Sequence, residues 1–389
     1  MKFNKLARLS IATSSLVLLV SCQAAGTQPS GLGFAASSAR QSLAFPPVGA
    51  HQVKRPPQLE TVSKLVAPTV REAGMPEDLW VRIRHDLSWH TEHNAKIETA
   101  RAALLQQPNY LPEVADRADF YLYYIVEEVQ KRGMPMEIAL VPMVESTLNP
   151  FASSSSGAAG MWQIMPETGI HLGLEQDSWY DGRQALRDST TVALDYLESL
   201  HQQFDGDWLL ALAAYNCGAG TVARARQANQ DKGLPTDYWS LDLPHQTNAY
   251  VPKLIALAQL VAEPDRFGVT IPSVANAPSF EVAETGRPLK LSQAAKLAGV
   301  DIDTLRALNP GQLRGAIAPD RPAELLLPVG TRNRFEYNIA QLSPEELVQW
   351  QTYRIQPGDS LDHIARKFDT EVAVLQEANG LKDSSIQAG

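Results

Sequence analysis

One carboxylate, Glu145, stands in an apolar stretch of the chain with no second acidic residue beside it. Ile138, Val141 and Val144 are spaced as one face of a helix, which the sequence predicts over residues 136–146. A carboxyl group in apolar surroundings resists ionisation, so its pKa rises and it can act as a general acid near neutral pH. From this segment alone, a solvent-facing helical glutamate is the more economical interpretation.

The residues that follow favour a binding site. Ser153 to Gly160 carries almost no side-chain bulk, so the backbone here can approach a sugar strand or a packed helix closely. Met161, Trp162 and Gln163 then bring apolar faces and one amide to the same place. Sugars pack their apolar faces on aromatic rings and bond their hydroxyl and N-acetyl groups to amides. The alternative for Met161 and Trp162 is core packing.

A third group of polar residues stands farther along the chain. Ala214-Tyr215-Asn216 lies where a helix is expected to break. The Tyr215 hydroxyl is suited to hydrogen-bond a carboxyl group and hold its geometry. Its alternative role is that of a core aromatic residue whose hydroxyl has a partner.

The elements that must position these residues are mainly helical. From about Met75 to Gly268 the apolar residues recur at helical spacing, and no sustained alternation of strand type appears. Asp207 is expected to cap a helix that Asn216, Gly218 and Gly220 break. Pro252 is expected in the first turn of another. Five helices are expected in this part. The first begins at Asp78 and the second contains Phe120 to Val129. The other three span Thr190 to Phe204, Trp208 to Ala214 and Ala249 to Val261.

The tail differs, because it contains two related units at residues 280–330 and 352–389. The second unit begins with a predicted strand at residues 353–355, followed by two helices and a turn. Its GDSLDHIARKF segment resembles the LysM module, which binds N-acetylglucosamine polymers. The chain ends where this module would form its last strand, so the module is expected to be incomplete. The first unit lacks the Gly-Asp opening and resembles a degenerate LysM module. Its residues 325–328, Leu-Leu-Leu-Pro, are expected to form a strand.

The first residues indicate export. Basic residues precede an apolar run, Ile11 to Val20, which is too short to span a membrane. Leu19-Val20-Ser21-Cys22 resembles the lipobox of bacterial lipoproteins. We therefore expect a signal peptide at residues 1–21, a lipid on Cys22 and a flexible tether at 22–74. Gln23 after the lipidated cysteine favours anchoring of the protein at the periplasmic face of the outer membrane. The alternative to a lipoprotein signal is a plain secretory signal.

Composition excludes several other classes. The 389 residues carry a formal net charge of −9, with 44% hydrophobic and 20% charged residues, as in ordinary globular proteins. The sequence has no basic patch with interleaved aromatic residues, so a nucleic acid partner is not expected. With Cys22 acylated, Cys217 has no disulfide partner. The sequence has no Cys-His or Cys-x-x-Cys spacing of the kind that forms a metal or redox site.

The motifs together resemble the lytic transglycosylases of the goose-type-lysozyme superfamily. Glu145-Ser146 matches the family's ES motif, residues 157–163 match GxxGxxQ, residues 214–216 match AYN, and Tyr250-Val251 matches the aromatic motif that follows. All of these motifs occur in the family's order. The resemblance implies a small, lysozyme-like α domain at residues 75–275, followed by the small α+β LysM-like modules.

By this resemblance Glu145 is the catalytic residue and peptidoglycan glycan strands are the partner. Glu145 would protonate the oxygen between N-acetylmuramic acid (MurNAc) and N-acetylglucosamine (GlcNAc), then remove the proton of the muramic C6 hydroxyl. That reaction leaves a 1,6-anhydro end and needs neither a cofactor nor a metal. The substrate-binding residues implied by the motifs are Ser154, Gln163, Tyr215, Asn216 and Tyr250.

One residue departs from the family pattern, and two other functions agree with the sequence. Gln246 stands where the family commonly has a glutamate linked to substrate binding. A hydrolytic lysozyme would need a second carboxylate, for which Asp177 and Asp181 are the candidates. A murein-binding lipoprotein without catalysis would use the LysM units alone.

Overall fold

The computed structural model describes residues 76–177, 179–317, 324–342, 353–368, 372–379, 381 and 383–387. The expected signal peptide, the lipidated Cys22 and the tether at 22–74 lie outside these described residues, as does any closing strand at 388–389.

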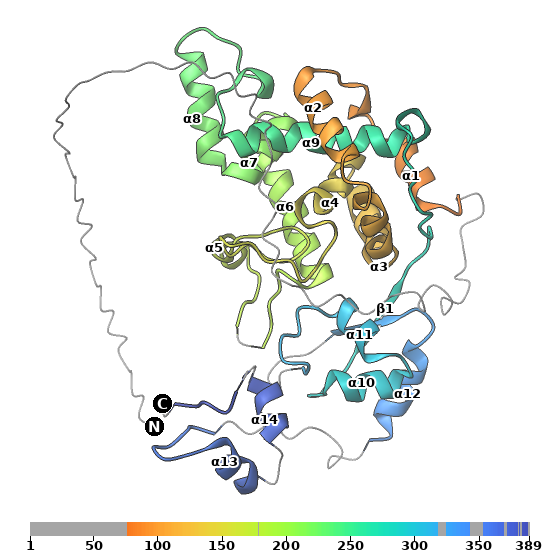
Figure 1. Ribbon diagram of the computed structural model, residues 1–389, viewed down its shortest axis with the longest axis vertical. Helices are drawn as coiled ribbons and strands as arrows, with labels where there is room; N and C mark the ends of the chain where they lie inside the picture. The colour runs from red at the N-terminus through yellow and green to blue at the C-terminus, as the bar shows by residue number, and fades with distance from the viewer. Residues whose placement is uncertain are drawn as a thin grey trace, which may run out of the picture. The chain divides into compact units, whose positions relative to one another are not determined.

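The larger part of the described chain is helical (Figure 1). Its α-helices are α1 (Leu79–Asp86), α2 (Ala95–Leu105), α3 (Tyr110–Lys131), α4 (Val141–Ser146), α5 (Pro166–His171), α6 (Leu186–Gln203), α7 (Trp208–Cys217), α8 (Ala219–Gln230) and α9 (His245–Ala262). Short 3₁₀ turns are η2 (Trp89–Thr91), η3 (Met136–Leu140), η4 (Tyr238–Ser240) and η5 (Asp265–Phe267).

Helix α9 is the element around which this part packs. Most of its residues are buried, and it contacts α2, α7, η2 and α4. Pro252 lies inside α9 rather than in its first turn, so the sequence-based placement of this proline was wrong. The helix begins at His245, earlier than expected, and its first two residues, His245 and Gln246, are exposed.

Several helix boundaries follow local capping chemistry. The Asp207 carboxylate accepts hydrogen bonds from the amides of Leu209 and Leu210, which confirms its expected role as the cap of α7. That helix continues through Asn216 and ends at Gly218, which has a φ of 87°. Gly220 does not break a helix, because it lies within α8. The helix expected over residues 136–146 is divided into η3 and α4.

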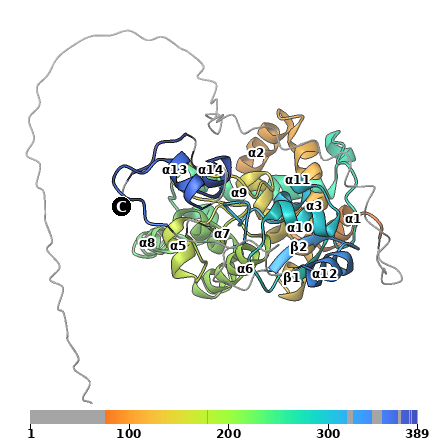
Figure 2. The same ribbon diagram turned by 90° about the horizontal axis from the view of Figure 1, so that it is seen from below.

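The first tail unit has a core of its own and a two-stranded antiparallel sheet (Figure 2). Strand β1 (Phe280–Glu284) pairs with β2 (Glu324–Pro328), with Val282 opposite Leu326. Helices α10 (Leu291–Ala298) and α11 (Ile302–Leu308) lie between the strands in sequence, and α12 (Arg332–Ala340) follows them. The order of strand, helix, helix and strand agrees with the sequence prediction, whereas α12 was not foreseen.

The second tail unit contains α13 (Leu361–Lys367) and α14 (Val372–Asn379). The strand expected at residues 353–355 does not form, because no described strand pairs with that segment. Tyr353 instead donates its hydroxyl hydrogen to Asp359 over 2.8 Å and packs its ring edgewise on Phe368.

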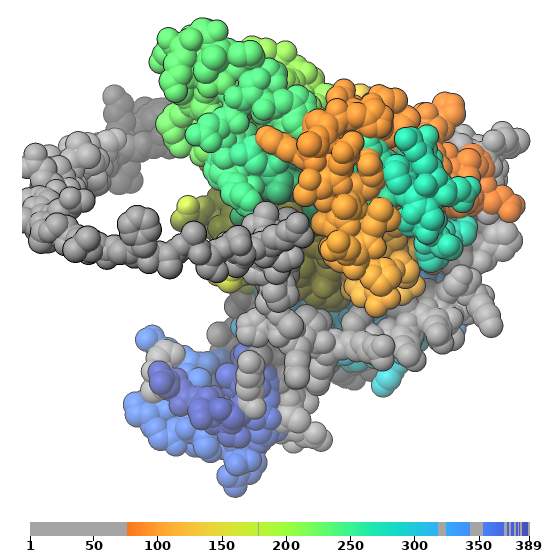
Figure 3. All heavy atoms as spheres, turned by 45° about the horizontal axis from the view of Figure 1, so that its top comes forward, coloured from red at the N-terminus to blue at the C-terminus, as the bar shows by residue number. Residues whose placement is uncertain are grey.

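Helices α2 and α8 lie on the face of the molecule that Figure 3 presents, coloured orange and green. Within the described part of the chain, no helix has both the length and the apolar character needed to cross a membrane.

Candidate active site

Glu145 lies in the last turn of α4, where the chain changes direction sharply. The residues after the helix, Thr147 and Leu148, both have left-handed backbones, with φ of 57° and 56°. Such conformations are strained for residues with a Cβ and persist only where surrounding contacts hold them. One such contact is the hydrogen bond of 2.8 Å from Arg117 Nη1 to the Thr147 carbonyl. The strained turn therefore fixes the end of the helix that carries Glu145.

The surroundings of Glu145 favour its protonated form. Burial raises the pKa of Glu145 to about 7, while the Tyr250 hydroxyl and the charge of Lys253 act in the opposite direction. No other carboxylate among the described residues contributes to this shift. A group with a pKa near 7 exchanges its proton readily at neutral pH, which suits an acid that must later act as a base.

Helix α9 brings Tyr250 and Lys253 to this carboxyl group. The two residues are spaced by three positions, so they share one face of the helix. Lys253 donates a hydrogen bond of 3.3 Å to the Val144 carbonyl, and burial lowers the pKa of its ammonium group. The Tyr250 hydroxyl is buried and forms no hydrogen bond of normal geometry with any described residue. It is nevertheless close enough to Glu145 to lower the pKa of that carboxyl group. Its buried hydroxyl is therefore available to the carboxyl group or to a ligand.

Lys253 is the residue of this group that the sequence analysis missed. Its position one turn after Tyr250 in the segment Tyr250-Val251-Pro252-Lys253 was the available signal. A basic residue on the same helical face as a motif tyrosine is expected to lie near the same acid.

The glycine-rich loop, residues 152–164, packs directly against the end of α4. Ser146, the residue after Glu145, donates its hydroxyl hydrogen toward the carbonyls of Met161 at 3.0 Å and Pro142 at 3.1 Å. Gly160 has a φ of 79°, and a Cβ there would collide with the Arg183 carbonyl. The close backbone approach predicted for this glycine is confirmed, but its neighbour is another part of the protein.

Gln163 is held at the end of this loop in a left-handed conformation, with a φ of 49°. Its side-chain Nε2 donates to the Gly160 carbonyl over 2.8 Å. The opposite atom, Oε1, accepts no hydrogen bond from the described residues. The amide is therefore fixed by its nitrogen, and its oxygen is left to accept a bond from a ligand.

Met161 and Trp162 belong to the core. Both side chains are fully buried, and Trp162 Nε1 donates to the Thr190 hydroxyl over 3.0 Å. The hypothesis that Trp162 offers an aromatic face to a sugar was wrong, because no part of its ring reaches the surface. The large ring instead anchors the glycine-rich loop to the hydrophobic core.

Tyr215 also acts on the loop and does not bond the carboxyl group as expected. Its hydroxyl donates to the Trp162 carbonyl over 2.8 Å, and its ring packs against that of Tyr196. Burial and the nearby Glu145 raise the pKa of Tyr215 well above its usual value, so it stays protonated as a donor. The neighbouring Asn216 accepts a hydrogen bond of 2.8 Å from the Thr247 hydroxyl.

Ser154 and Gln246 lie at the edges of this arrangement. Ser154 is partly buried, and its hydroxyl oxygen accepts a hydrogen bond of 2.9 Å from the Ala158 amide, which closes the turn of the serine run. Gln246 is exposed in the first turn of α9.

The two candidates for a second carboxylate have structural partners. Asp177 accepts hydrogen bonds from the amides of Trp179 and Tyr180, at 2.7 and 2.9 Å. Asp181 is buried and forms a two-pronged ion pair with Arg183, at 2.9 and 2.7 Å. A carboxylate committed to a buried guanidinium group is a poor nucleophile or base.

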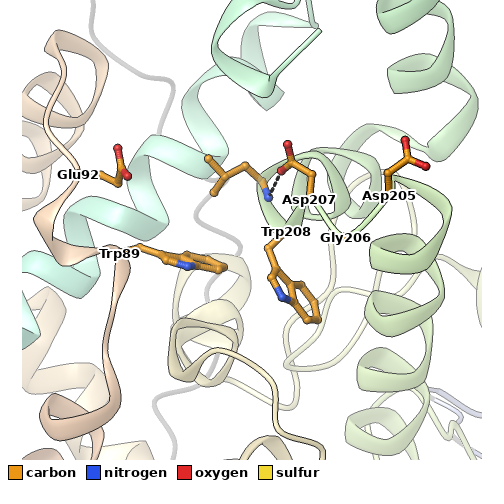
Figure 4. A pocket seen from close by; sticks show the side chains of 7 residues that line it. Trp89, Glu92, Asp205, Gly206, Asp207 and Trp208 are labelled. Carbon is orange, nitrogen blue, oxygen red and sulfur yellow. Dashed lines mark hydrogen bonds between the residues drawn. The ribbon is translucent and has the colours of Figure 1, made fainter.

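A separate hollow of about 450 Å³ lies near the other end of α7 (Figure 4). The rings of Trp89 and Trp208 point into it from η2 and α7, and Glu92, Asp205 and Asp207 stand at its rim. Asp207 caps α7, and Asp205 is ion-paired with Arg226 at 3.0 Å. Tyr215 lies near the opposite end of the same helix, and none of the residues that line this hollow is among those placed around Glu145.

Comparison with known protein families gives three matches along the chain. Residues 123–236 match the transglycosylase SLT domain, residues 279–344 the LysM-like domain of lytic transglycosylase MltD, and residues 353–389 the LysM domain. Membrane-bound lytic murein transglycosylase D of Escherichia coli K12 is 34% identical over 322 residues, covering 80% of this chain and 71% of that protein. Soluble lytic murein transglycosylase of Salmonella typhimurium is 40% identical over 83 residues, covering 20% of this chain and 13% of that protein.

Two solved structures share part of the chain at lower similarity. They are lytic transglycosylase Slt of Pseudomonas aeruginosa, 21% identical over 49% of this chain and 33% of its own, and the 70 kDa soluble lytic transglycosylase of E. coli, 18% identical over 46% and 32%. Their TM-scores are 0.30 and 0.31, too low to define the fold of this chain. The extent and identity of the match to the E. coli D-type protein decide the family. The chain belongs to the membrane-bound lytic murein transglycosylase D family, and it is a lytic transglycosylase.

Proposed function

We propose that Glu145 alone supplies the acid and the base for cleavage of the β-1,4 bond between MurNAc and GlcNAc in peptidoglycan. The observation that carries this proposal is the raised pKa of Glu145, about 7, with no second carboxylate contributing to its surroundings among the described residues. A hydrolase of the usual kind needs two carboxyl groups, one to activate a water or attack the sugar. Here the sugar's own hydroxyl takes that role.

The steps conserve protons and consume no water. Protonated Glu145 gives its proton to the glycosidic oxygen as the bond from that oxygen to muramic C1 breaks, which releases the 4-hydroxyl of GlcNAc. The C6 hydroxyl oxygen of the same muramic residue then bonds to C1. Its proton passes to the Glu145 carboxylate, which restores the acid. The products are a 1,6-anhydro-MurNAc end and a free GlcNAc end.

Lys253 and Tyr250 would assist at different stages. The Lys253 ammonium group stabilises the Glu145 carboxylate that forms after the first proton transfer. The Tyr250 hydroxyl, which lies close to Glu145, can then donate to that carboxylate and limit its movement. Both contributions lower the cost of a buried charge while leaving the ground-state acid protonated.

The substrate contacts belong to the residues that keep an unused polar atom. Gln163 Oε1 is oriented by the bond through its Nε2, so it can accept from a sugar hydroxyl or N-acetyl N–H. Asn216 accepts from Thr247 through Oδ1 and retains Nδ2 as a donor. Ser154 can donate its hydroxyl hydrogen, because its oxygen serves only as an acceptor for Ala158. Tyr215 would act through the loop that it supports.

We further propose the cellular arrangement that the sequence indicates. Residues 1–21 are a signal peptide, Cys22 carries a lipid, residues 22–74 are a tether, and residues 75–275 are the catalytic domain at the periplasmic face of the outer membrane. The units at 280–330 and 352–389 bind or position murein. Cys22→Ala, expressed in cells, should release the protein from the membrane fraction. Recovery of that variant with the outer membrane would contradict lipid anchoring.

Product analysis tests the proposed reaction. Murein digested by the protein should yield fragments with anhydro-muramic ends by mass spectrometry, and Glu145→Gln should yield none while still binding murein. Reducing muramic ends would indicate a hydrolytic lysozyme instead. Binding without any cleavage by the wild-type protein would indicate a murein-binding lipoprotein.

A further inference from the structure

The loop that leads from α11 toward β2 in the first tail unit contacts the catalytic part of the chain through its backbone. The Asp181 amide donates to the Gly311 carbonyl over 3.0 Å, and the Leu313 amide donates to the Trp179 carbonyl over 2.9 Å. Tyr180 and Gln312 face each other between these bonds as an antiparallel bridge. The loop, residues 309–313 (the docking loop), therefore forms a short piece of sheet with residues 179–181.

The docking loop is itself held rigidly within its own module. The Asn309 side chain is buried and donates through Nδ2 to the carbonyls of Leu305 and Leu326, both at 2.8 Å. Its Oδ1 accepts from the Leu326 amide at 2.9 Å. These bonds tie the loop to α11 and β2, so its position follows that of the module.

The fit at Gly311 leaves no room for a side chain. A Cβ at this position would lie 3.0 Å from the Tyr180 ring and 3.1 Å from both the Ala185 Cβ and the Asp181 carbonyl oxygen. Contacts of this length require the neighbours to move by a few tenths of an ångström. A side chain at residue 311 would therefore widen the contact between the docking loop and residues 180–185.

Asp181 passes this contact on to Arg183. The Asp181 carboxylate accepts from the Arg183 amide as well as from the guanidinium group, at 2.7–3.0 Å. Arg183 Nη1 then donates to the Gly157 carbonyl over 2.8 Å and reaches the Ile164 carbonyl at 3.4 Å. One guanidinium group therefore joins both sides of the glycine-rich loop.

The glycine-rich loop in turn contacts the catalytic residues. Its Met161 carbonyl accepts from Ser146, the neighbour of Glu145, and its Trp162 carbonyl accepts from Tyr215. The loop also carries Gln163. A continuous series of hydrogen bonds thus leads from the docking loop, through Asp181 and Arg183, to the residues around Glu145.

We propose that the first LysM-like module is a positioning element of the active site, which fixes the glycine-rich loop through the Gly311–Asp181–Arg183 contacts. This inference rests on the proposed role of Glu145 and adds a second requirement to it. The docking loop touches no substrate, and its effect is on the geometry of Gln163 and the end of α4. A misplacement of about 1 Å at such a site, caused by a change far from the chemistry, can lower the rate of the chemical step by about 10²-fold.

Gly311→Ala in the full-length protein is the direct test. It should lower kcat on murein glycan strands by roughly tenfold with little change in KM, because positioning is disturbed and substrate contacts are kept. Amide hydrogen exchange at Gly160 and Ile164 should become faster. The control is Gly286→Ala in the same module, where an added Cβ meets nothing within 4 Å but is strained by the φ of 63°, so the variant perturbs the module locally without touching the docking contact. That variant should keep the wild-type kcat and exchange rates.

A double-mutant cycle distinguishes an effect carried through the Asp181–Arg183 hydrogen bonds from a general loss of stability. Arg183→Lys keeps the charge but loses the two-pronged geometry, so it should lower kcat on its own and speed the same exchange. Combined with Gly311→Ala, its effect should be clearly less than the product of the single effects. Equal kcat for Gly311→Ala and Gly286→Ala, or independent effects in the cycle, would overturn the inference. If Gly311→Ala fails to fold, unchanged kcat and exchange in Arg183→Lys would overturn it as well.

The outcome distinguishes this inference from the proposed reaction. A wild-type protein that forms anhydro ends through Glu145, together with a fully active Gly311→Ala, rejects the positioning role alone. A wild-type protein without anhydro ends, or an active Glu145→Gln, rejects the proposed reaction.

Discussion

Two carboxyl groups, the partly buried Glu145 and the buried Asp181, have neighbours, Ser146 and Arg183, that bond the glycine-rich loop, and their surroundings differ in one respect. Asp181 is committed to Arg183 by a two-pronged ion pair that also closes the loop. Glu145 faces a tyrosine hydroxyl and a lysine but has no such fixed partner, and its pKa rises to about 7. A carboxyl group that must exchange a proton cannot be bound permanently as an anion, whereas one that supports a loop must be. The comparison therefore separates a catalytic acid from a structural one.

The largest effect is expected from Glu145→Gln. The amide keeps the shape of the side chain but cannot give a proton, so the rate of murein cleavage should fall by roughly 10²- to 10⁴-fold. Murein binding in a pull-down assay should stay unchanged. Glu92→Gln, at the exposed rim of the separate hollow, is the control and should cleave at the wild-type rate. Substantial activity in Glu145→Gln would show that this residue is not the acid.

A smaller effect, on stability rather than chemistry, is expected from Asp181→Asn. Removal of one charge leaves the largely buried Arg183 guanidinium without its anion, which should lower the free energy of unfolding by roughly 3 kcal/mol. Urea denaturation followed by circular dichroism measures this change. A variant as stable as the wild type would mean that the two carboxyl groups do not differ as described.

The pH dependence of stability should also distinguish Glu145. Its pKa is raised on folding, so the folded protein holds this proton more tightly than the unfolded chain. The stabilisation present at low pH is therefore lost as pH rises from about 4.5 through about 7. Relative to Glu145→Gln, the wild type should lose up to about 3 kcal/mol between pH 5 and pH 8. Parallel stability curves for the two proteins over that range would contradict the raised pKa.

The smallest predicted effect concerns Lys253. Replacement by methionine removes the positive charge that opposes the upward shift, so the pKa of Glu145 should rise further. The alkaline limb of the kcat–pH profile should move up by roughly one pH unit. Lys232→Met, at an exposed turn after α8, should leave the profile in place. A shift to lower pH in Lys253→Met would mean that the ammonium group does not stabilise the carboxylate.

The sequence predicted the features that depend on neighbours along the chain. The helical character of the first part, the cap at Asp207 and the strand at residues 325–328 all follow from local spacing and turn chemistry. The motifs also indicated the family correctly. Local patterns failed at Pro252, which the buried apolar face of α9 tolerates inside the helix, and at residues 353–355, where no partner strand is described.

The site itself was predicted only in part, because its geometry depends on contacts between distant segments. Burial of Trp162 and the bond from Tyr215 to its carbonyl arise from packing of the loop on α6 and α7. The approach of Lys253 to Glu145 requires α9 to cross the end of α4. The contact at Gly311 joins residues in two separate units. Neither composition nor spacing specifies such pairs.

Digestion of murein in water enriched in ¹⁸O tests whether one carboxyl group directs an attack by a hydroxyl of the same sugar. If Glu145 acts as proposed, mass spectrometry should find 1,6-anhydro-muramic ends without ¹⁸O, since the oxygen bonded to C1 comes from the same sugar. Muramic reducing ends that carry ¹⁸O from the solvent would instead show that water is the nucleophile and would rule out attack by the C6 hydroxyl.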